Sequence, residues 1–220
     1  MRAPVTIAHR AGNDRAALQR ALAAGVDAVE VDLRLDRGRL VARHDRRFPF
    51  LPLYYDRWHL RLSIDRQITL EELLERLDGR AALLVDVKSP NVRALQQLLD
   101  TLRSQNAIAG TRMSSAIWPL LRHARGSEPR IKVHYSIGNP QELARFWALQ
   151  EGTHEANGVS IKEGLLDKTL SDRFLTEGIE IAAYNVYDFE RARQLVAWGV
   201  TAIISGDLSL LRRLKEVSGG

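Results

Sequence analysis

The chain contains no cysteine, which excludes disulfide bonds and every reaction that needs a thiolate. It also lacks a run of about eighteen apolar residues, the length that a membrane-spanning helix requires. Near the amino terminus a short apolar run ends at Ala8 and is followed by His9 and Arg10, which does not fit a secretory signal. We therefore expect a cytoplasmic protein without an integral membrane segment.

With 45% hydrophobic and 27% charged residues, the chain has the composition of a folded globular protein. Its 220 residues predict one domain over residues 1–220. The net charge of +5 favours anionic partners such as phosphate esters. The arginines are scattered and form no basic stripe with interleaved aromatic residues, so nucleic acid is not an expected partner. We expect a small-molecule substrate, and the sequence leaves the oligomeric state open.

Short apolar strands alternate with amphipathic helices along almost the whole chain. The predicted strands are Val5–His9, Val26–Leu35, Ala82–Val87, Thr111–Ser114, Arg130–Tyr135, Gly158–Ile161, Ile179–Asn185 and Val200–Ser205. The helices that follow them are Asn13–Gly25, Thr69–Leu77, Val92–Arg103, Ser115–Arg125, Pro140–Leu149, Asp167–Glu177, Asp188–Trp198 and Leu208–Val217. This alternation is typical of a parallel sheet, and eight units predict an α/β fold that closes into a (β/α)8 TIM barrel.

The second unit departs from this rhythm. A turn at Asp36-Arg37-Gly38 and a return arm over Leu40–Arg43 predict a short hairpin after the second strand. The long segment Asp45–Ile68 comes next, where a barrel carries functional loops. Its aromatic part, within residues 48–58, could pack as a lid, line the site for a lipid-like substrate, or contact a membrane or partner. We favour the packed lid.

Polar residues gather where the early strands and the hairpin end. They are His9 and Arg10, Glu30 and Asp32, His44 and Asp45, and Asp86 and Lys88. Because the carboxyl ends of barrel strands share one mouth, we expect these side chains to meet there. Tyr184 and Asn185 are expected to line the same mouth. For His134 and Lys162 the sequence leaves a substrate contact and an ordinary structural role equally open.

These residue types suit one kind of chemistry. The carboxylates of Glu30, Asp32 and Asp86 would form an oxygen-rich site for a divalent cation such as Mg²⁺, Ca²⁺ or Mn²⁺. His9 and His44 could serve as general acid and base near neutral pH. Arg10 and Lys88 could hold a phosphate and offset charge on its oxygens. Together they indicate hydrolysis or transfer at a phosphodiester.

The same residues stand in a familiar order. His9-Arg10, Asn13, the run from Gly25 to Asp32, Asp36-Arg37-Gly38 and His44-Asp45 resemble the amino-terminal signature of the glycerophosphodiester phosphodiesterase family. Asp86-Val87-Lys88 is similar to that family's Glu-x-Lys after the third strand, and residues 113–115, 184–186 and 199–205 resemble its later strands. Two departures are clear: Ala11 precedes Gly12 where the family has His-Arg-Gly, and Asp86 stands where the family has Glu.

The resemblance implies a (β/α)8 barrel that hydrolyses a glycerophosphodiester to sn-glycerol 3-phosphate and an alcohol. It implies metal binding by Glu30, Asp32 and Asp86, with His9 and His44 as the catalytic pair. It also implies that Arg10 and Lys88 contact phosphate, and we assign Tyr184 to substrate binding. The sequence leaves open a lysophospholipid or other phosphodiester as substrate, and a weakly active protein that binds phosphorylated ligands. It also leaves open attack by water or by the substrate's own hydroxyl through a cyclic phosphate.

Overall fold

The computed structural model of the chain describes residues 3–47, 53–56, 59–62, 67–153 and 156–218. Eight parallel strands pair side by side, and the first pairs with both the second and the last, so the sheet closes into a barrel. The prediction of a (β/α)8 barrel is confirmed. The barrel strands are β1 (Val5–Ala8), β2 (Ala28–Asp36), β7 (Ala82–Val87), β8 (Thr111–Ser115), β9 (Lys132–Ile137), β10 (Gly158–Lys162), β11 (Glu180–Tyr184) and β12 (Ala202–Ser205).

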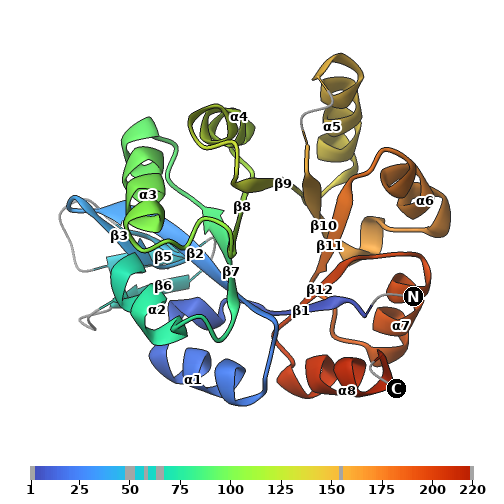
Figure 1. The fold of residues 1–220 in the computed structure, drawn as a ribbon, viewed down its shortest axis with the longest axis horizontal. Coiled ribbons are helices and arrows are strands. Elements are labelled where there is room, and N and C mark those ends of the chain that lie inside the picture. The colour runs from blue at the N-terminus through green and yellow to red at the C-terminus, as the bar shows by residue number, and fades with distance from the viewer. Residues whose placement is uncertain (1–2, 48–52, 57–58, 63–66, 154–155, 219–220) are drawn as a thin grey trace.

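Helices form a ring outside the strands (Figure 1). They are α1 (Arg15–Ala23), α2 (Leu70–Leu77), α3 (Val92–Ser104), α4 (Trp118–Ser127), α5 (Pro140–Thr153), α6 (Lys168–Thr176), α7 (Phe189–Ala197) and α8 (Leu208–Ser218), with 3₁₀ turns η1 (Ala11–Asn13) and η2 (Glu163–Leu165). Side chains cap two of these helices: the Thr69 side chain accepts the N–H of Glu72 at the start of α2, and that of Asp188 accepts the N–H of Arg191 at the start of α7. Within the described ranges, no helix combines the length and apolarity that a membrane crossing needs.

The strands alternate between two environments, since successive side chains of a strand point to opposite faces. On β2, Val29, Val31 and Leu33 belong to the large apolar cluster that includes the helices. Ala28, two residues before Glu30, belongs instead to a small second cluster. That cluster comprises Ile7, Ala28, Leu84, Ala182, Ala202 and Ile204. Most of the apolar core therefore belongs to the first cluster, and much of the barrel interior is polar.

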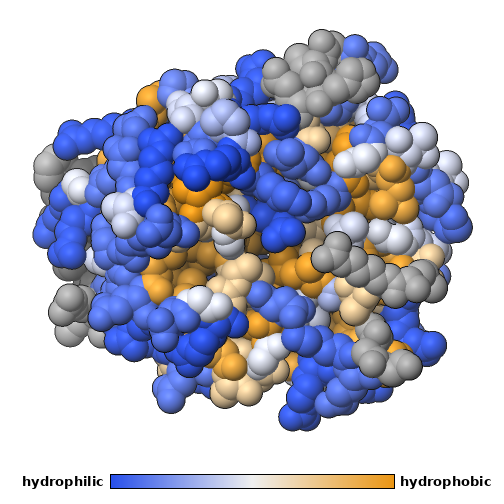
Figure 2. Space-filling model, in the orientation of Figure 1, coloured by the Kyte–Doolittle hydropathy of each residue, from blue (hydrophilic) through white to orange (hydrophobic). Residues whose placement is uncertain are grey.

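The amino-terminal end of the barrel holds a cavity of about 370 Å³. Figure 2 looks onto this end, where apolar side chains gather at the centre and hydrophilic ones surround them. Three basic side chains from neighbouring strands surround Glu180 here: Lys132 Nζ lies 2.5 Å from Glu180 Oε1, while His134 Nε2 and Arg112 Nε each lie 3.4 Å from Oε2. These contacts keep the pKa of Glu180 well below its usual range, chiefly through His134.

His134 therefore lies at the amino-terminal end of the barrel and not at the mouth, which favours the structural role that the sequence left open for it. Its strand was predicted over Arg130–Tyr135, but β9 begins and ends two residues later. This shift places His134 in the amino-terminal half of the strand, and Ser136 and Gly138 line the cavity at the carboxyl end instead.

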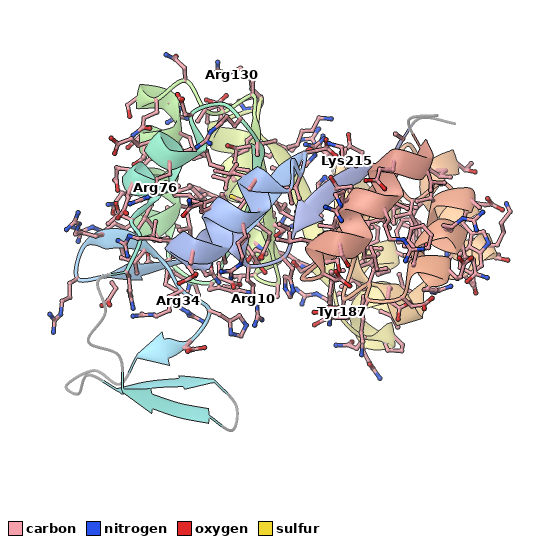
Figure 3. The ribbon with its side chains drawn as sticks, turned by 90° about the horizontal axis from the view of Figure 1, so that it is seen from below. Arg10, Arg34, Arg76, Arg130, Tyr187 and Lys215 are labelled. Carbon is pink, nitrogen blue, oxygen red and sulfur yellow. The ribbon has the colours of Figure 1, made fainter. Side chains whose placement is uncertain are left out.

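The second unit carries the insertion that the sequence predicts. The arm β3 (Arg39–Ala42) pairs antiparallel with the end of β2, which confirms the hairpin. Beyond it lies a small antiparallel sheet of β4 (Arg46–Arg47), β5 (Leu53–Asp56) and β6 (His59–Leu62), on the side of the barrel where Arg10 and Arg34 lie (Figure 3). The long segment Asp45–Ile68 thus contains three short strands among its described residues. The packed lid stays a prediction, because Phe48, Phe50 and Trp58 lie outside the described residues.

Helices α1 and α2 are joined by a forked ion pair. Arg15 donates from Nε and Nη2 to the two carboxylate oxygens of Glu72, at 2.7 and 2.8 Å. Arg76 adds a hydrogen bond to Glu72 from the next turn of α2. The hydrogen bond from Arg15 is the main reason that the pKa of Glu72 falls from 4.5 to about 2.

Replacing Glu72 should remove a pH-dependent part of the stability. A carboxyl with a lowered folded-state pKa stabilises above its unfolded value of 4.5, and this contribution disappears as pH falls towards about 2. We expect Glu72→Gln to lower the melting temperature near neutral pH by roughly 2–4 °C, for a pair worth ~1 kcal/mol. The deficit should shrink as the pH is lowered from about 5 to about 2. Melting curves of Glu71→Gln, an exposed neighbour, provide the control; a deficit in Glu72→Gln that stays constant with pH would contradict the assignment.

Candidate active site

A cavity of about 950 Å³ opens at the carboxyl ends of the barrel strands. All eight side chains assigned from the sequence to metal, phosphate or substrate binding or to catalysis line it. They are His9, Arg10, Glu30, Asp32, His44, Asp86, Lys88 and Tyr184. Lys162 and Asn185 also line this cavity. The structure thus brings together residues that are up to 175 positions apart in the chain, since they extend from His9 to Tyr184.

Three carboxylates lie at the centre of the site. Glu30 and Asp32 share the inward face of β2, and Asp86 on β7 is the direct neighbour of Asp32 in the sheet register. One oxygen of each lies within 4.8 Å of the others. Glu30 and Asp32 are almost fully buried.

Burial and mutual repulsion make this cluster unfavourable on its own. Burial raises the pKa of Glu30 well above its usual value, and the charges of Asp32 and Asp86 raise it further. Burial also raises the pKa of Asp86. For Asp32 the effect of burial is outweighed by Lys88 and by a hydrogen bond from Asn13, so its pKa is lowered.

The three carboxylates fit a divalent cation. They offer hard oxygen ligands from two adjacent strands, within one ion's reach. Oδ1 of Asp86 is buried and has no hydrogen-bond partner among the described residues, which is costly unless another group binds it. A cation bound here would use that oxygen and relieve the repulsion.

Two residues that follow β1 hold two of these carboxylates in place, Arg10 through its backbone and Asn13 through its side chain. Arg10 has a left-handed conformation with φ of 54°, and its N–H donates to Glu30 Oε2 at 2.5 Å. Asn13 brackets Asp32: its Nδ2 donates to Asp32 Oδ2 at 2.7 Å, and its Oδ1 accepts the Asp32 N–H at 2.9 Å. Asp14 caps α1 instead, by accepting the N–H of Ala17. Asn13 therefore orients a carboxylate rather than capping the helix.

Gly12 is required by the same close approach. A Cβ at this position would lie 2.7 Å from Cβ of Val31 and 3.2 Å from the backbone oxygen of Glu30. The turn η1 therefore packs directly on β2. This explains why the chain keeps a glycine here although Ala11 takes the place next to Arg10.

Two cations lie against the carboxylates. Lys88 Nζ is 2.6 Å from Asp86 Oδ2 and 3.1 Å from Asp32 Oδ1. Burial by itself would lower the pKa of Lys88, but Asp86 and Asp32 outweigh it and raise that pKa. Arg10 Nε is 3.4 Å from Asp32 Oδ2, and its side chain is 45% exposed. Both cations are thus at the cavity wall, where an anionic ligand could contact them.

The two histidines reach the cavity from different elements. His9 follows β1, and its backbone N–H donates to the carbonyl of Ser205. Burial, followed by the charge of Arg10, lowers the pKa of His9 to about 4, so its imidazole is neutral at neutral pH. His44 follows β3, outside the barrel, and its Nδ1 lies 3.6 Å from Asp45 Oδ1. A neutral imidazole and a second imidazole in one cavity provide the groups that a proton transfer needs.

Several residues of the site were not identified from the sequence. Arg34 lines the cavity and follows Glu30 and Asp32 at the same two-residue spacing, so strand periodicity could have identified it. Asn139 and Glu142, at the start of α5, also line the cavity. The hydroxyl of Tyr184 donates to the carbonyl of Ile137 at 3.3 Å. No sequence signal predicts the positions of Asn139 and Glu142 or the hydrogen bond of Tyr184.

The fold and site thus define a (β/α)8 barrel with an acidic, cation-flanked cavity at its carboxyl end. The fold is similar to that of a glycerophosphodiester phosphodiesterase from Thermotoga maritima, with a TM-score of 0.78, 18% identity and coverage of 97% of this chain and 99% of that one. A phosphodiesterase from Oleispira antarctica, solved with the product sn-glycerol-3-phosphate, has a TM-score of 0.77 and 18% identity. The match covers 99% of this chain and 98% of that one. A glycerophosphodiester phosphodiesterase from Parabacteroides distasonis has a TM-score of 0.76 and 17% identity, and the match covers 100% of both chains.

These likenesses show that the chain has the fold of those proteins over its whole length. No family model and no curated protein matches the sequence. At this level of identity the likeness shows the fold alone, so the activity has to be inferred from the residues of this chain.

Loss of one carboxylate should weaken cation binding. We expect Asp86→Asn to bind Mn²⁺ at least about tenfold more weakly than the unaltered protein, since ligands and their supporting groups each contribute on this scale. Titration calorimetry or electron paramagnetic resonance of Mn²⁺ measures this directly. Glu75→Gln, an exposed acid of α2, is the matched control. Equal Mn²⁺ affinity in Asp86→Asn would remove Asp86 from the cation site.

Proposed function

We propose that the chain is a metal-dependent phosphodiesterase that hydrolyses a glycerophosphodiester to sn-glycerol 3-phosphate and an alcohol. The observation that carries the proposal is the convergence of three carboxylates, two imidazoles and two cations in one cavity. The likeness to solved phosphodiesterases supports it, above all the one that holds sn-glycerol-3-phosphate.

The substrate phosphate would be held by the cationic side of the cavity. Arg10 and Lys88 provide N–H donors that can bind phosphate oxygens, and their charges favour an anion. A divalent cation bound by Glu30, Asp32 and Asp86 would polarise the phosphoryl group and offset its charge. Tyr184 lines the same cavity and would contact the bound substrate.

The two imidazoles would move the protons. His9 is neutral because of its lowered pKa, so it can take the proton of the attacking hydroxyl as an oxygen–phosphorus bond forms. His44 would give a proton to the departing alcohol oxygen as its bond to phosphorus breaks. Where the attacking hydroxyl belongs to the glycerol of the substrate, a cyclic phosphate forms first and water then opens it to the same product.

A substrate panel tests the proposal. The purified protein would be given glycerophosphocholine, glycerophosphoethanolamine, lysophosphatidylcholine and bis(p-nitrophenyl) phosphate with Mg²⁺, Mn²⁺ or Ca²⁺. Release of glycerol 3-phosphate that EDTA abolishes is the expected result. Turnover of the lysophospholipid alone would assign the site to lipids. Binding of glycerol 3-phosphate without turnover of any diester would make the chain a binding protein.

Removal of either imidazole should abolish most of the activity. We expect His9→Ala and His44→Ala each to lower the rate by at least ~100-fold, the usual scale for an acid–base group. His123→Ala, an exposed histidine on α4, should retain the full rate. Mn²⁺ binding measured in parallel shows whether the site is intact. A near-normal rate in His9→Ala or His44→Ala would take that residue out of the mechanism.

A further inference from the structure

Arg34 contacts both of the segments that carry His44 and Lys88. It lies on β2, two residues after Asp32, and lines the site cavity. Its guanidinium donates from Nε and Nη2 to the backbone carbonyl of His44, at 3.0 and 2.9 Å. From Nη1 it donates to the backbone carbonyl of Lys88, at 3.3 Å.

The two carbonyls belong to segments on opposite sides of β2. His44 follows β3, which pairs with the end of β2 along one edge. Lys88 follows β7, which pairs with β2 along the other edge. Just beyond the last paired residues, each segment still donates one backbone N–H to β2: Arg43 to the carbonyl of Asp32, and Lys88 to that of Leu33. Arg34 lies between them, and its fork contacts both at that point.

The attachment of His44 depends strongly on such contacts, because His44 does not lie on a barrel strand. The N–H of Arg43 donates to the carbonyl of Asp32 at 2.7 Å and holds the backbone just before His44. The carbonyl of His44 itself receives the two donors of Arg34. Rotation of this peptide would turn the imidazole of His44 relative to the cavity.

We propose that Arg34 is a positioning residue that fixes the imidazole of His44 in its working orientation. The inference rests on the proposed function for its kinetic consequence. Charge-assisted hydrogen bonds from a planar guanidinium are strong and directional, and one guanidinium can bind two acceptors at fixed geometry. Lysine has the same charge but carries no fork, so it cannot replace these three bonds.

The kinetic test compares Arg34→Met and Arg34→Lys with the unaltered protein. A misplaced catalytic group lowers kcat, so we expect kcat to fall on the order of 10–100-fold in both variants. KM should change by less than about threefold, because binding of the ground state is preserved. Arg39→Met, an exposed arginine of the same hairpin, is the matched control and should leave both constants unchanged.

Two other kinetic patterns would overturn the inference. A large rise in KM that Arg34→Lys restores would mean that Arg34 acts as a cation on the substrate. A lower melting temperature with an unchanged kcat per folded molecule would mean that it only stabilises the fold.

A second readout does not depend on activity. In protein labelled at histidine, the imidazole resonances of His44, assigned through His44→Ala, should shift in Arg34→Met and stay in place in Arg39→Met. An unshifted His44 signal in Arg34→Met would refute the inference. If no diester is turned over by the unaltered protein, the proposed function fails, and this spectrum still decides whether Arg34 positions His44.

Discussion

Three carboxylates buried within reach of one another repel, and the rest of the site is arranged around that repulsion. Lys88 lies between Asp86 and Asp32, and Arg10 lies against Asp32. With three acids and two cations, the ionised cluster retains one negative charge. The raised pKa of Glu30 shows where a proton would offset it. Binding of a divalent cation at this cluster would therefore be thermodynamically linked to loss of that proton.

The same strand supports both the core and the site. Side chains of β2 that point outward are apolar and pack under the helices, whereas Glu30, Asp32 and Arg34 point into the cavity. Because successive side chains of a strand point to opposite faces, fixing the register of β2 decides which of its side chains enter the core and which enter the cavity. Gly12 and Asn13 then bring the turn after β1 against this strand, and they hold the register of the carboxylates. Core packing and the geometry of the candidate site thus depend on one set of contacts.

This division explains what the sequence could predict. Apolar alternation identified all eight barrel strands, and polar residues at the strand ends identified the cavity wall, because both signals are local. The position of His134 was missed by a two-residue error in one strand boundary. The roles of Asn13 and Arg34 were missed because their partners lie 19, 10 and 54 residues away. The sheet of β4–β6 was missed because its described strands pair with one another rather than with the barrel and show no barrel rhythm.

The polar interior also determines where the stability of the barrel resides. Among the described residues, six buried side chains form the small apolar cluster to which Ala28 belongs, and Val5, Ala82 and Tyr184 pack against it. Leu84 of this cluster lines both the site cavity and the amino-terminal cavity. So thin a layer contributes little apolar burial, and the main contribution must come from the large cluster that joins strands and helices. Side chains that face the mouth are therefore freer to change than those that face the helices. A barrel built in this way can keep its fold while its chemistry varies, because the two faces of each strand serve different purposes.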